Sequence, residues 1–333
     1  MVEFSPSRLE QLFREFNGKR IAVVGDLMVD RYFWGTVNRI SPEAPVPVVE
    51  VESQSTRLGG AANVANNVSS LGGIPIMIGV IGNDDGGHLL KKLIEESGFP
   101  TSGLVVDTAR PTTIKTRVIA HHQHVVRIDH EVKEDISESI QAQIFKVLKN
   151  ELSSLDAIIL EDYNKGVVVG GLIKEIVALA RSKGIIVTVD PKFNNFFEYK
   201  HVTVFKPNRK ESEEALGRRL NNRAAVEQAG RDILRELDAE NILLTLGSEG
   251  MSLFERSGSV THVSTHAKKV ADVSGAGDTV ISTLTMCLAA GAGIKEASAL
   301  ANIAGGVVCG EVGIVPIDKP ALFNTITEHH RSD

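Results

Sequence analysis

Short apolar segments recur along the chain, and most of them end in a glycine or a polar residue. The first, RIAVVGD (20–26), is rich in β-branched residues. A short run that is apolar at nearly every position is typical of a parallel strand buried on both faces. The same pattern predicts further strands at 75–82, 156–162, 184–190, 202–208 and 241–247.

Segments with helical periodicity separate most of the predicted strands. They cover residues 5–17, 137–153, 170–183 and 222–237. Strands that alternate with helices predict an α/β fold, with a mostly parallel sheet and helices on both of its faces. Because ligands bind at the carboxyl ends of such strands, the polar residues found there should converge on one crevice. These residues are Asp26, Asp162, Asp190 and Asn208.

Four other segments do not follow the alternation of strands and helices. Residues 31–37 and 46–52 resemble a strand pair joined by a proline-rich turn, and residues 112–120 and 124–131 resemble a second pair. We expect these strands to form a small separate sheet that serves as a lid or an interface. Arg117 and Arg127 lie an even number of residues apart, so they share a face if the hairpin register is regular.

The composition is that of an ordinary globular protein, with 42% hydrophobic and 23% charged residues. A net charge of −6 and the lack of basic runs argue against binding to nucleic acid or anionic lipid. No apolar run has the length of a membrane span, and the N-terminus lacks the pattern of a signal peptide. Cys287 and Cys309 lie among small apolar residues, which predicts reduced core cysteines. These features predict a cytoplasmic protein.

The segment DVSGAGDTV (272–280) is the strongest candidate for chemistry. Gly275, Ala276 and Gly277 would form a tight turn whose N–H groups, at the beginning of a helix, suit an anion such as a phosphate. Asp278 would follow in the first helical turn, where a carboxylate can deprotonate an attacking hydroxyl. The alternative is that Asp278 only caps the helix.

The segment LGGAANVANN (58–67) combines the glycine pair Gly59 and Gly60 with asparagines in an apolar helix, Asn63 among them. Fixed amides suit the hydroxyls of a sugar, and Asp26 and Asp30 could bind pairs of hydroxyls. The alternative is a close helix–sheet contact that needs small residues. The P-loop and dinucleotide motifs do not occur in the sequence, so any nucleotide phosphates must be bound by other means.

Four segments in order resemble the ribokinase-like (pfkB) carbohydrate kinases: GGAANVANN (59–67), KPNRKE (206–211), TLGSEGM (245–251) and DVSGAGDTV (272–280). The resemblance implies a ribokinase-like fold and the use of ATP and Mg²⁺, and it leaves a monovalent-cation requirement open. It implies that Asp278 is the base and that the N–H groups of Gly275, Ala276 and Gly277 bind the transferred phosphate. The small sheet would be a lid through which a homodimer forms.

The resemblance also implies roles at the nucleotide end of the site. Asn208 and Glu211 would place magnesium and phosphate, acting on the metal through water or phosphate. Thr245, Gly247 and Asn302 would border the nucleotide.

Within this family, residues 25–51, 161–166 and 189–192 are similar to D-glycero-β-D-manno-heptose 7-phosphate kinases of ADP-heptose and lipopolysaccharide synthesis. That likeness implies cations for a sugar phosphate, with Arg117, Arg127, Lys165 and Lys192 as candidates, each of which could equally be a solvated surface cation. We expect one kinase domain over residues 1–333, with lid strands near 31–52 and 112–128 and no adenylyltransferase domain. The alternatives are a fructose or fructose 6-phosphate kinase and a non-catalytic regulator that binds sugar or nucleotide.

Overall fold

The computed structural model describes residues 4–121, 123–265, 273–311 and 313–332. Its main body is a nine-stranded sheet in the order β13-β12-β11-β10-β9-β8-β1-β4-β5. The strands from β11 to β5 in this order pair in parallel. β12 pairs with both β11 and β13 in antiparallel register. The bounds are β1 Arg20–Gly25, β4 Ile74–Ile81, β5 Leu104–Val106, β8 Ala157–Glu161, β9 Ile186–Asp190, β10 Val204–Phe205, β11 Asn241–Thr245, β12 Met251–Glu255 and β13 Val260–Val263.

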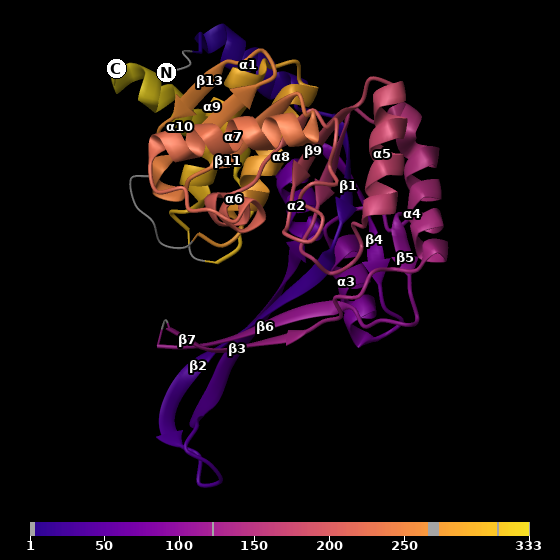
Figure 1. Ribbon diagram of the computed structural model, residues 1–333. Coiled ribbons are helices and arrows are strands. Elements are labelled where there is room, and N and C mark those ends of the chain that lie inside the picture. The colour runs from indigo at the N-terminus through magenta and orange to yellow at the C-terminus, as the bar shows by residue number, and fades with distance from the viewer. Residues whose placement is uncertain (1–3, 122, 266–272, 312, 333) are drawn as a thin grey trace.

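Helices cover both faces of the main sheet, as the alternating pattern predicts (Figure 1). The side chains of β1 alternate between two apolar clusters, with Ile21 and Val23 on one face and Ala22 and Val24 on the other. The helices are α1 Pro6–Glu15, α2 Ala61–Ser70, α3 Asp85–Glu96, α4 Glu138–Glu151, α5 Gly170–Ser182, α6 Arg209–Leu216, α7 Arg223–Leu237, α8 Ala276–Ala289, α9 Ile294–Val308 and α10 Lys319–Ser332, with short 3₁₀ turns at Leu152–Ser154 and Gly247–Glu249.

Helices α4, α5 and α7 lie on the face of Ala22 and Val24, whereas α1, α2, α8, α9 and α10 lie on the opposite face. Phe13 of α1 packs edge to face on Phe323 of α10, with ring centroids 5.2 Å apart, so the two ends of the chain share one region of the surface (Figure 1). Within the described residues, the structure contains no helix that is both long and apolar enough to span a membrane.

A second sheet of four strands projects from one end of the main body (Figure 1). Its order is β3-β2-β6-β7, with bounds β2 Leu27–Ile40, β3 Pro47–Gly60, β6 Thr113–Ala120 and β7 Gln123–His130. β2 pairs with β3 and β6 with β7 in antiparallel register, and β2 pairs with β6 in parallel. The small sheet that the sequence predicts is therefore present, with longer strands in its first pair.

The sequence predicts β10 at 202–208, but the strand covers only Val204 and Phe205. Pro207 has no N–H to donate, so the ladder cannot continue through it. After this interruption a single parallel bridge pairs Asn208 with Thr245 of β11, and Asn208 is the N-cap of α6.

Candidate active site

The beginning of α8 forms the centre of the site. Gly275 has φ 80°, a left-handed conformation that a residue with a side chain rarely adopts, and α8 begins at Ala276. The first N–H groups of a helix have no partner within it, and the positive end of its dipole lies there. The tight glycine turn that the sequence predicts is thus present at residues 275–277, and the Ala276 N–H donates to the Val273 carbonyl at 3.3 Å. The role of this turn in binding an anion stays a prediction, and Asp272 of the same motif lies outside the described residues.

Asp278 is buried in the first turn of α8, and partners from two other segments hold its carboxylate. Asn63 of α2 donates its Nδ2–H to Oδ2 at 2.6 Å. Tyr163, which follows β8, donates its hydroxyl to Oδ1 at 2.7 Å. Burial raises the pKa of Asp278 to about 6, although the hydrogen bonds from Asn63 and Tyr163 act in the opposite direction. A carboxylate with this pKa is ionised at neutral pH and basic enough to accept a proton.

Three carboxylates meet at the carboxyl ends of β8 and β9 beside α8. Glu161, Asp190 and Asp278 each offer an oxygen atom, and these oxygens lie within 4.8 Å of one another. Burial and the neighbouring Asp190 and Asp278 raise the pKa of Glu161 well above its usual range. Its Oε2 atom is buried without a hydrogen-bond partner.

Two lysines accompany this cluster. Lys206 Nζ lies 2.9 Å from Asp190 Oδ2, and Lys192 pairs with Glu211. Burial lowers the pKa of Lys206, but Asp190 and Glu211 outweigh it and raise that pKa, so the ammonium stays charged. Lys206 pairs with Asp190 and Lys192 with Glu211, and neither Glu161 nor Asp278 forms an ion pair among the described residues. Two buried carboxyl groups without a cationic partner, one of them with an unpartnered oxygen, fit a divalent cation with oxygen ligands.

Asn208 and Glu211 form a capping box at the beginning of α6. The Asn208 side chain accepts from the Glu211 N–H at 2.9 Å, and the Glu211 carboxylate accepts from the Asn208 N–H at 2.8 Å. Glu211 also bonds Lys192. These contacts give both residues a structural role, and their predicted role toward magnesium stays a prediction.

A cavity of about 290 Å³ opens beside the glycine turn at 275–277. Thr245, Gly247 and Asn302, predicted at the nucleotide, all line it, together with Ala276 and Gly277 of the turn. Cys309 also lines this cavity and is half-buried, so the prediction that it belongs to the core is wrong, whereas Cys287 is buried as expected. Cys309 lies immediately after α9, at the point where the chain turns out of the helix layer.

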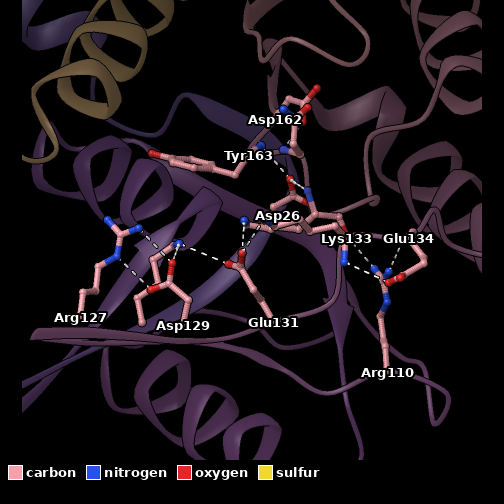
Figure 2. A network of polar contacts seen from close by, with 12 residues as sticks. Asp26, Arg110, Arg127, Asp129, Glu131, Lys133, Glu134, Asp162 and Tyr163 are labelled. Carbon is pink, nitrogen blue, oxygen red and sulfur yellow. Dashed lines mark hydrogen bonds and ion pairs between the residues drawn. The ribbon is translucent and has the colours of Figure 1, made fainter.

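Asp26 has a different environment from the one that the sequence suggests. Its carboxylate accepts the backbone N–H groups of Tyr163 at 2.7 Å, Lys165 at 3.1 Å and Val167 at 3.2 Å (Figure 2). Only 1% of the residue is exposed. Both carboxylate oxygens accept hydrogen bonds from the loop after β8. The geometry therefore gives no support to the predicted contact of Asp26 with sugar hydroxyls.

The glycine pair and the asparagines have clear structural partners. A side chain on Gly59 would lie 2.2 Å from Asp30 Oδ2, and one on Gly60 would lie 2.4 Å from the carbonyl oxygen of Asp26. The glycines therefore allow β3 to end against the two aspartates. Asn63 holds Asp278, and Asn67 accepts the Thr279 hydroxyl at 3.0 Å.

Each of the four predicted cations has a carboxylate partner. Arg117 bonds Asp30, Arg127 bonds Asp129, Lys165 bonds Glu131 and Lys192 bonds Glu211. Arg117 and Arg127 lie directly opposite each other in the β6–β7 register, so they share a face of the small sheet. Lys115, which was not among the predicted cations, lies on the same face and pairs with both Asp129 and Glu131. Figure 2 shows these two carboxylates side by side. Lys192 lies apart from this group, in the carboxylate cluster.

Sequence reasoning also missed Glu161, Tyr163 and the contacts of Lys206. Glu161 directly precedes the predicted strand-end residue Asp162, and an acidic residue inside an otherwise apolar strand was the signal for it. The contacts of Tyr163 and Lys206 depend on which strands are neighbours in the sheet, which periodicity does not reveal.

The fold and the site together define a class of enzyme, an α/β phosphotransferase with a buried carboxylate beside a glycine turn at the beginning of a helix. Residues 19–320 match the family described as pfkB family carbohydrate kinase. The chain belongs to this family and is a carbohydrate kinase.

The chain is similar to proteins named bifunctional protein HldE. The one from Desulfatibacillum aliphaticivorans is 44% identical over 307 residues, which are 92% of this chain and 63% of that protein. The one from Geobacter sulfurreducens is 40% identical over 322 residues, which are 97% of this chain and 66% of that protein. The chain thus spans just under two thirds of the length of these relatives.

Solved structures with the same fold have lower identity. Phosphofructokinase-2 from Escherichia coli, in its tetrameric inhibited form, gives a TM-score of 0.75 at 18% identity, covering 93% of this chain and 99% of that chain. Ribokinase from Arabidopsis thaliana, complexed with ribose and ATP, gives 0.73 at 18% identity with the same coverage. These similarities confirm the predicted ribokinase-like fold.

Proposed function

We propose that the chain transfers the γ-phosphoryl group of ATP to the anomeric hydroxyl of D-glycero-β-D-manno-heptose 7-phosphate. The products would be heptose 1,7-bisphosphate and ADP, and the former would enter ADP-heptose synthesis for lipopolysaccharide. The observation that carries the proposal is the identity of 40–44% with bifunctional HldE proteins over more than nine tenths of the chain. The segments at 25–51, 161–166 and 189–192 support the same substrate.

The residues of α8 suit the chemistry of this step. Asp278 accepts the proton of the sugar hydroxyl as its oxygen attacks the γ-phosphorus, and the bond from phosphorus to the ADP oxygen breaks. The N–H groups of residues 275–277 stabilise the negative charge on the transferred group. Thr245, Gly247 and Asn302 border the nucleotide in the cavity next to this turn.

Magnesium belongs to the proposal because the carboxylate cluster fits a divalent cation. Glu161 and Asp190 would hold it, with Asn208 and Glu211 acting through water or phosphate. When bound, the ion neutralises charge on the phosphates of ATP.

The phosphate of the sugar would bind near Arg117, Arg127 and Lys165. These cations are paired with carboxylates, and a phosphate with three acceptor oxygens can compete for them. Charge-assisted contacts contribute about 1.5–3 kcal/mol each, so two of them favour a phosphorylated sugar by roughly 10²-fold or more in kcat/KM.

The test compares kcat/KM for heptose 7-phosphate, unphosphorylated heptose, fructose 6-phosphate and fructose under one set of salt and magnesium conditions. We expect heptose 7-phosphate to exceed the other sugars. An equal or higher kcat/KM for fructose 6-phosphate would identify a different phosphosugar kinase. An equal kcat/KM for an unphosphorylated sugar would refute the proposed binding site for the sugar phosphate.

A second measurement tests whether the chain has turnover of its own. Asp278→Asn should keep ATP binding and lower kcat by roughly 10²-fold or more, as expected when a general base is lost. A normal kcat in this variant would refute the assignment of Asp278 as the base and leave it a structural role only. Absence of ADP release from the wild type with every sugar would favour a regulator.

We also propose a cytoplasmic homodimer that forms through the small sheet. The apolar side chains of Val126 and Ile128 are about half exposed on β7. They alternate with Arg127 and Asp129, so they lie on the face away from the charged pairs. A second copy of the chain would bury this apolar face.

A further inference from the structure

The carboxylate of Asp278 is held at both oxygens, and the two donors come from different segments. Asn63 holds Oδ2 from the first turns of α2. Tyr163 holds Oδ1 from the loop that follows β8. A carboxylate with one hydrogen bond can still rotate about its Cβ–Cγ bond, whereas two donors on opposite oxygens fix the plane of the group.

The backbone of Tyr163 is itself held in place. Asp26 accepts the N–H groups of Tyr163, Lys165 and Val167, so the loop wraps around a single buried carboxylate (Figure 2). Asn164 has φ 55° and Gly166 has φ 78°, which lets the chain turn tightly between these bonds. The ammonium of Lys192 lies 5.3 Å from the centre of the Tyr163 ring.

We propose that Tyr163 is a positioning residue that orients Asp278 toward the attacking sugar hydroxyl, and that Asp26 acts by holding Tyr163. The inference rests on the proposed role of Asp278 as the base. At neutral pH a tyrosine hydroxyl is a neutral donor, so it can hold the carboxylate without taking its charge away. The role assigned to Asp26 is therefore structural support of the base rather than contact with the sugar.

The expected consequence is a loss of turnover without a loss of binding. In Tyr163→Phe the ring remains and only the hydroxyl is removed, so the substrates still bind. The freed carboxylate then spends less time in the reactive orientation, and displacement of reacting groups by about 1 Å can cost up to roughly 10²-fold in rate. We expect kcat to fall by roughly tenfold or more, with the KM values of ATP and sugar changed by no more than about twofold.

Tyr199 provides a matched control. It is a fully buried tyrosine whose hydroxyl donates to Asp162 Oδ2 at 2.7 Å, in the same region of the molecule. Tyr199→Phe removes the same kind of bond from Asp162, which also accepts the Asn164 N–H at 2.7 Å, and it leaves both hydrogen bonds to the Asp278 carboxylate in place. We expect it to lower the unfolding temperature as much as Tyr163→Phe or more, while kcat stays close to that of the wild type.

The experiment measures kcat, both KM values and the unfolding midpoint for the wild type, the two phenylalanine variants, Asp278→Asn, and Asp278→Asn combined with each of them. If Tyr163 acts through Asp278, adding Tyr163→Phe to Asp278→Asn lowers kcat no further. An unchanged kcat in Tyr163→Phe, an equal loss in Tyr199→Phe, or full additivity in the Tyr163 double variant would each overturn the inference. Normal turnover in Asp278→Asn alone would instead refute the proposed base.

Discussion

At the scale of single residues, the surroundings of Asp278 decide what its carboxylate can do. The sequence alone is compatible with two roles for this residue, a helix cap and a base. In the structure the carboxylate bonds Asn63 and Tyr163, which belong to other segments, and burial raises its pKa to about 6. Neither feature follows from the motif, because the donors lie 215 and 115 residues away along the chain.

Glu211 combines a structural contact with a charge at the site. Glu211→Gln should preserve α6, because glutamine can also complete a capping box, but it removes the charge paired with Lys192. We expect a lower kcat and a higher magnesium concentration for half-maximal activity. A magnesium titration of initial rates provides the measurement.

The control is the same change at the beginning of another helix, where a glutamate also accepts from the N-cap N–H. Glu296 accepts from the Gly293 N–H at 2.8 Å at the beginning of α9 and pairs with Arg8. Glu296→Gln should leave the magnesium titration unchanged. If Glu211→Gln also leaves both kcat and the titration unchanged, the role of Asn208 and Glu211 is structural only.

At the scale of elements, the four helices predicted from periodicity are present close to their predicted bounds, whereas α3, α9 and α10 were not predicted and some strands were predicted poorly. Helix α4 begins and ends within two residues of its predicted bounds, since its apolar period and its Ser137 cap are local features. β10 is short because Pro207 interrupts it, and the three-residue β5 is too brief to produce a pattern. The glycines before α2 were recognised, but the reason for them, close contact with Asp26 and Asp30, depends on β3.

Asp84 joins two elements through one carboxylate. It caps α3 by accepting the Gly87 N–H at 2.8 Å, and it accepts the N–H and the hydroxyl of Thr112 before β6. Asp84→Ala should lower the free energy of unfolding by about 1–2 kcal/mol, or more if the Thr112 N–H is left unpaired. Chemical denaturation at neutral pH gives the value. Asn222→Ala removes only the N-cap hydrogen bond of α7, so it should lower the free energy of unfolding by a smaller amount.

The contribution of Asp84 should also depend on pH in a defined direction. Partial burial opposes its ionisation, but the bonds from Thr112 and Gly87 outweigh burial and lower its pKa below the usual 3.8. The ionised carboxylate therefore stabilises the fold fully at pH values above the usual pKa of 3.8. This stabilisation is lost as the pH falls through the lowered pKa of the folded state. The difference in the free energy of unfolding between the wild type and Asp84→Ala should therefore become smaller below about pH 4. A difference that grows on acidification would contradict this assignment.

At the scale of the whole molecule, two sheets with different surfaces share one chain. The main sheet is covered on both faces, whereas the small sheet projects from the body and exposes apolar side chains (Figure 1). Ile40, Val51, Val126 and Ile128 are each about half exposed or more. Apolar side chains gathered on a projecting sheet favour association with another copy.

The double variant Val126→Lys with Ile128→Lys should convert a dimer into a monomer, because four charges would meet across a two-fold interface. Light scattering after size-exclusion chromatography measures the mass. Ile74→Lys, at a similarly exposed apolar position at the beginning of β4, should leave the mass unchanged. A wild type that is monomeric, or a double variant that stays dimeric, would contradict the proposed interface.

The sequence by itself determined the α/β class, the helices on both sheet faces, the small second sheet and the glycine turn at 275–277. These features depend on periodicity and on glycine, whose effects are local. Tertiary structure alone decided which groups share the site. It placed carboxylate oxygens of Glu161, Asp190 and Asp278 within 4.8 Å of one another. The Asp26 carboxylate accepts backbone N–H groups of the loop that contains Tyr163, and each predicted cation pairs with a carboxylate. The physical reason is that charge interactions and burial act through space, between residues whose separation along the chain says nothing about their distance.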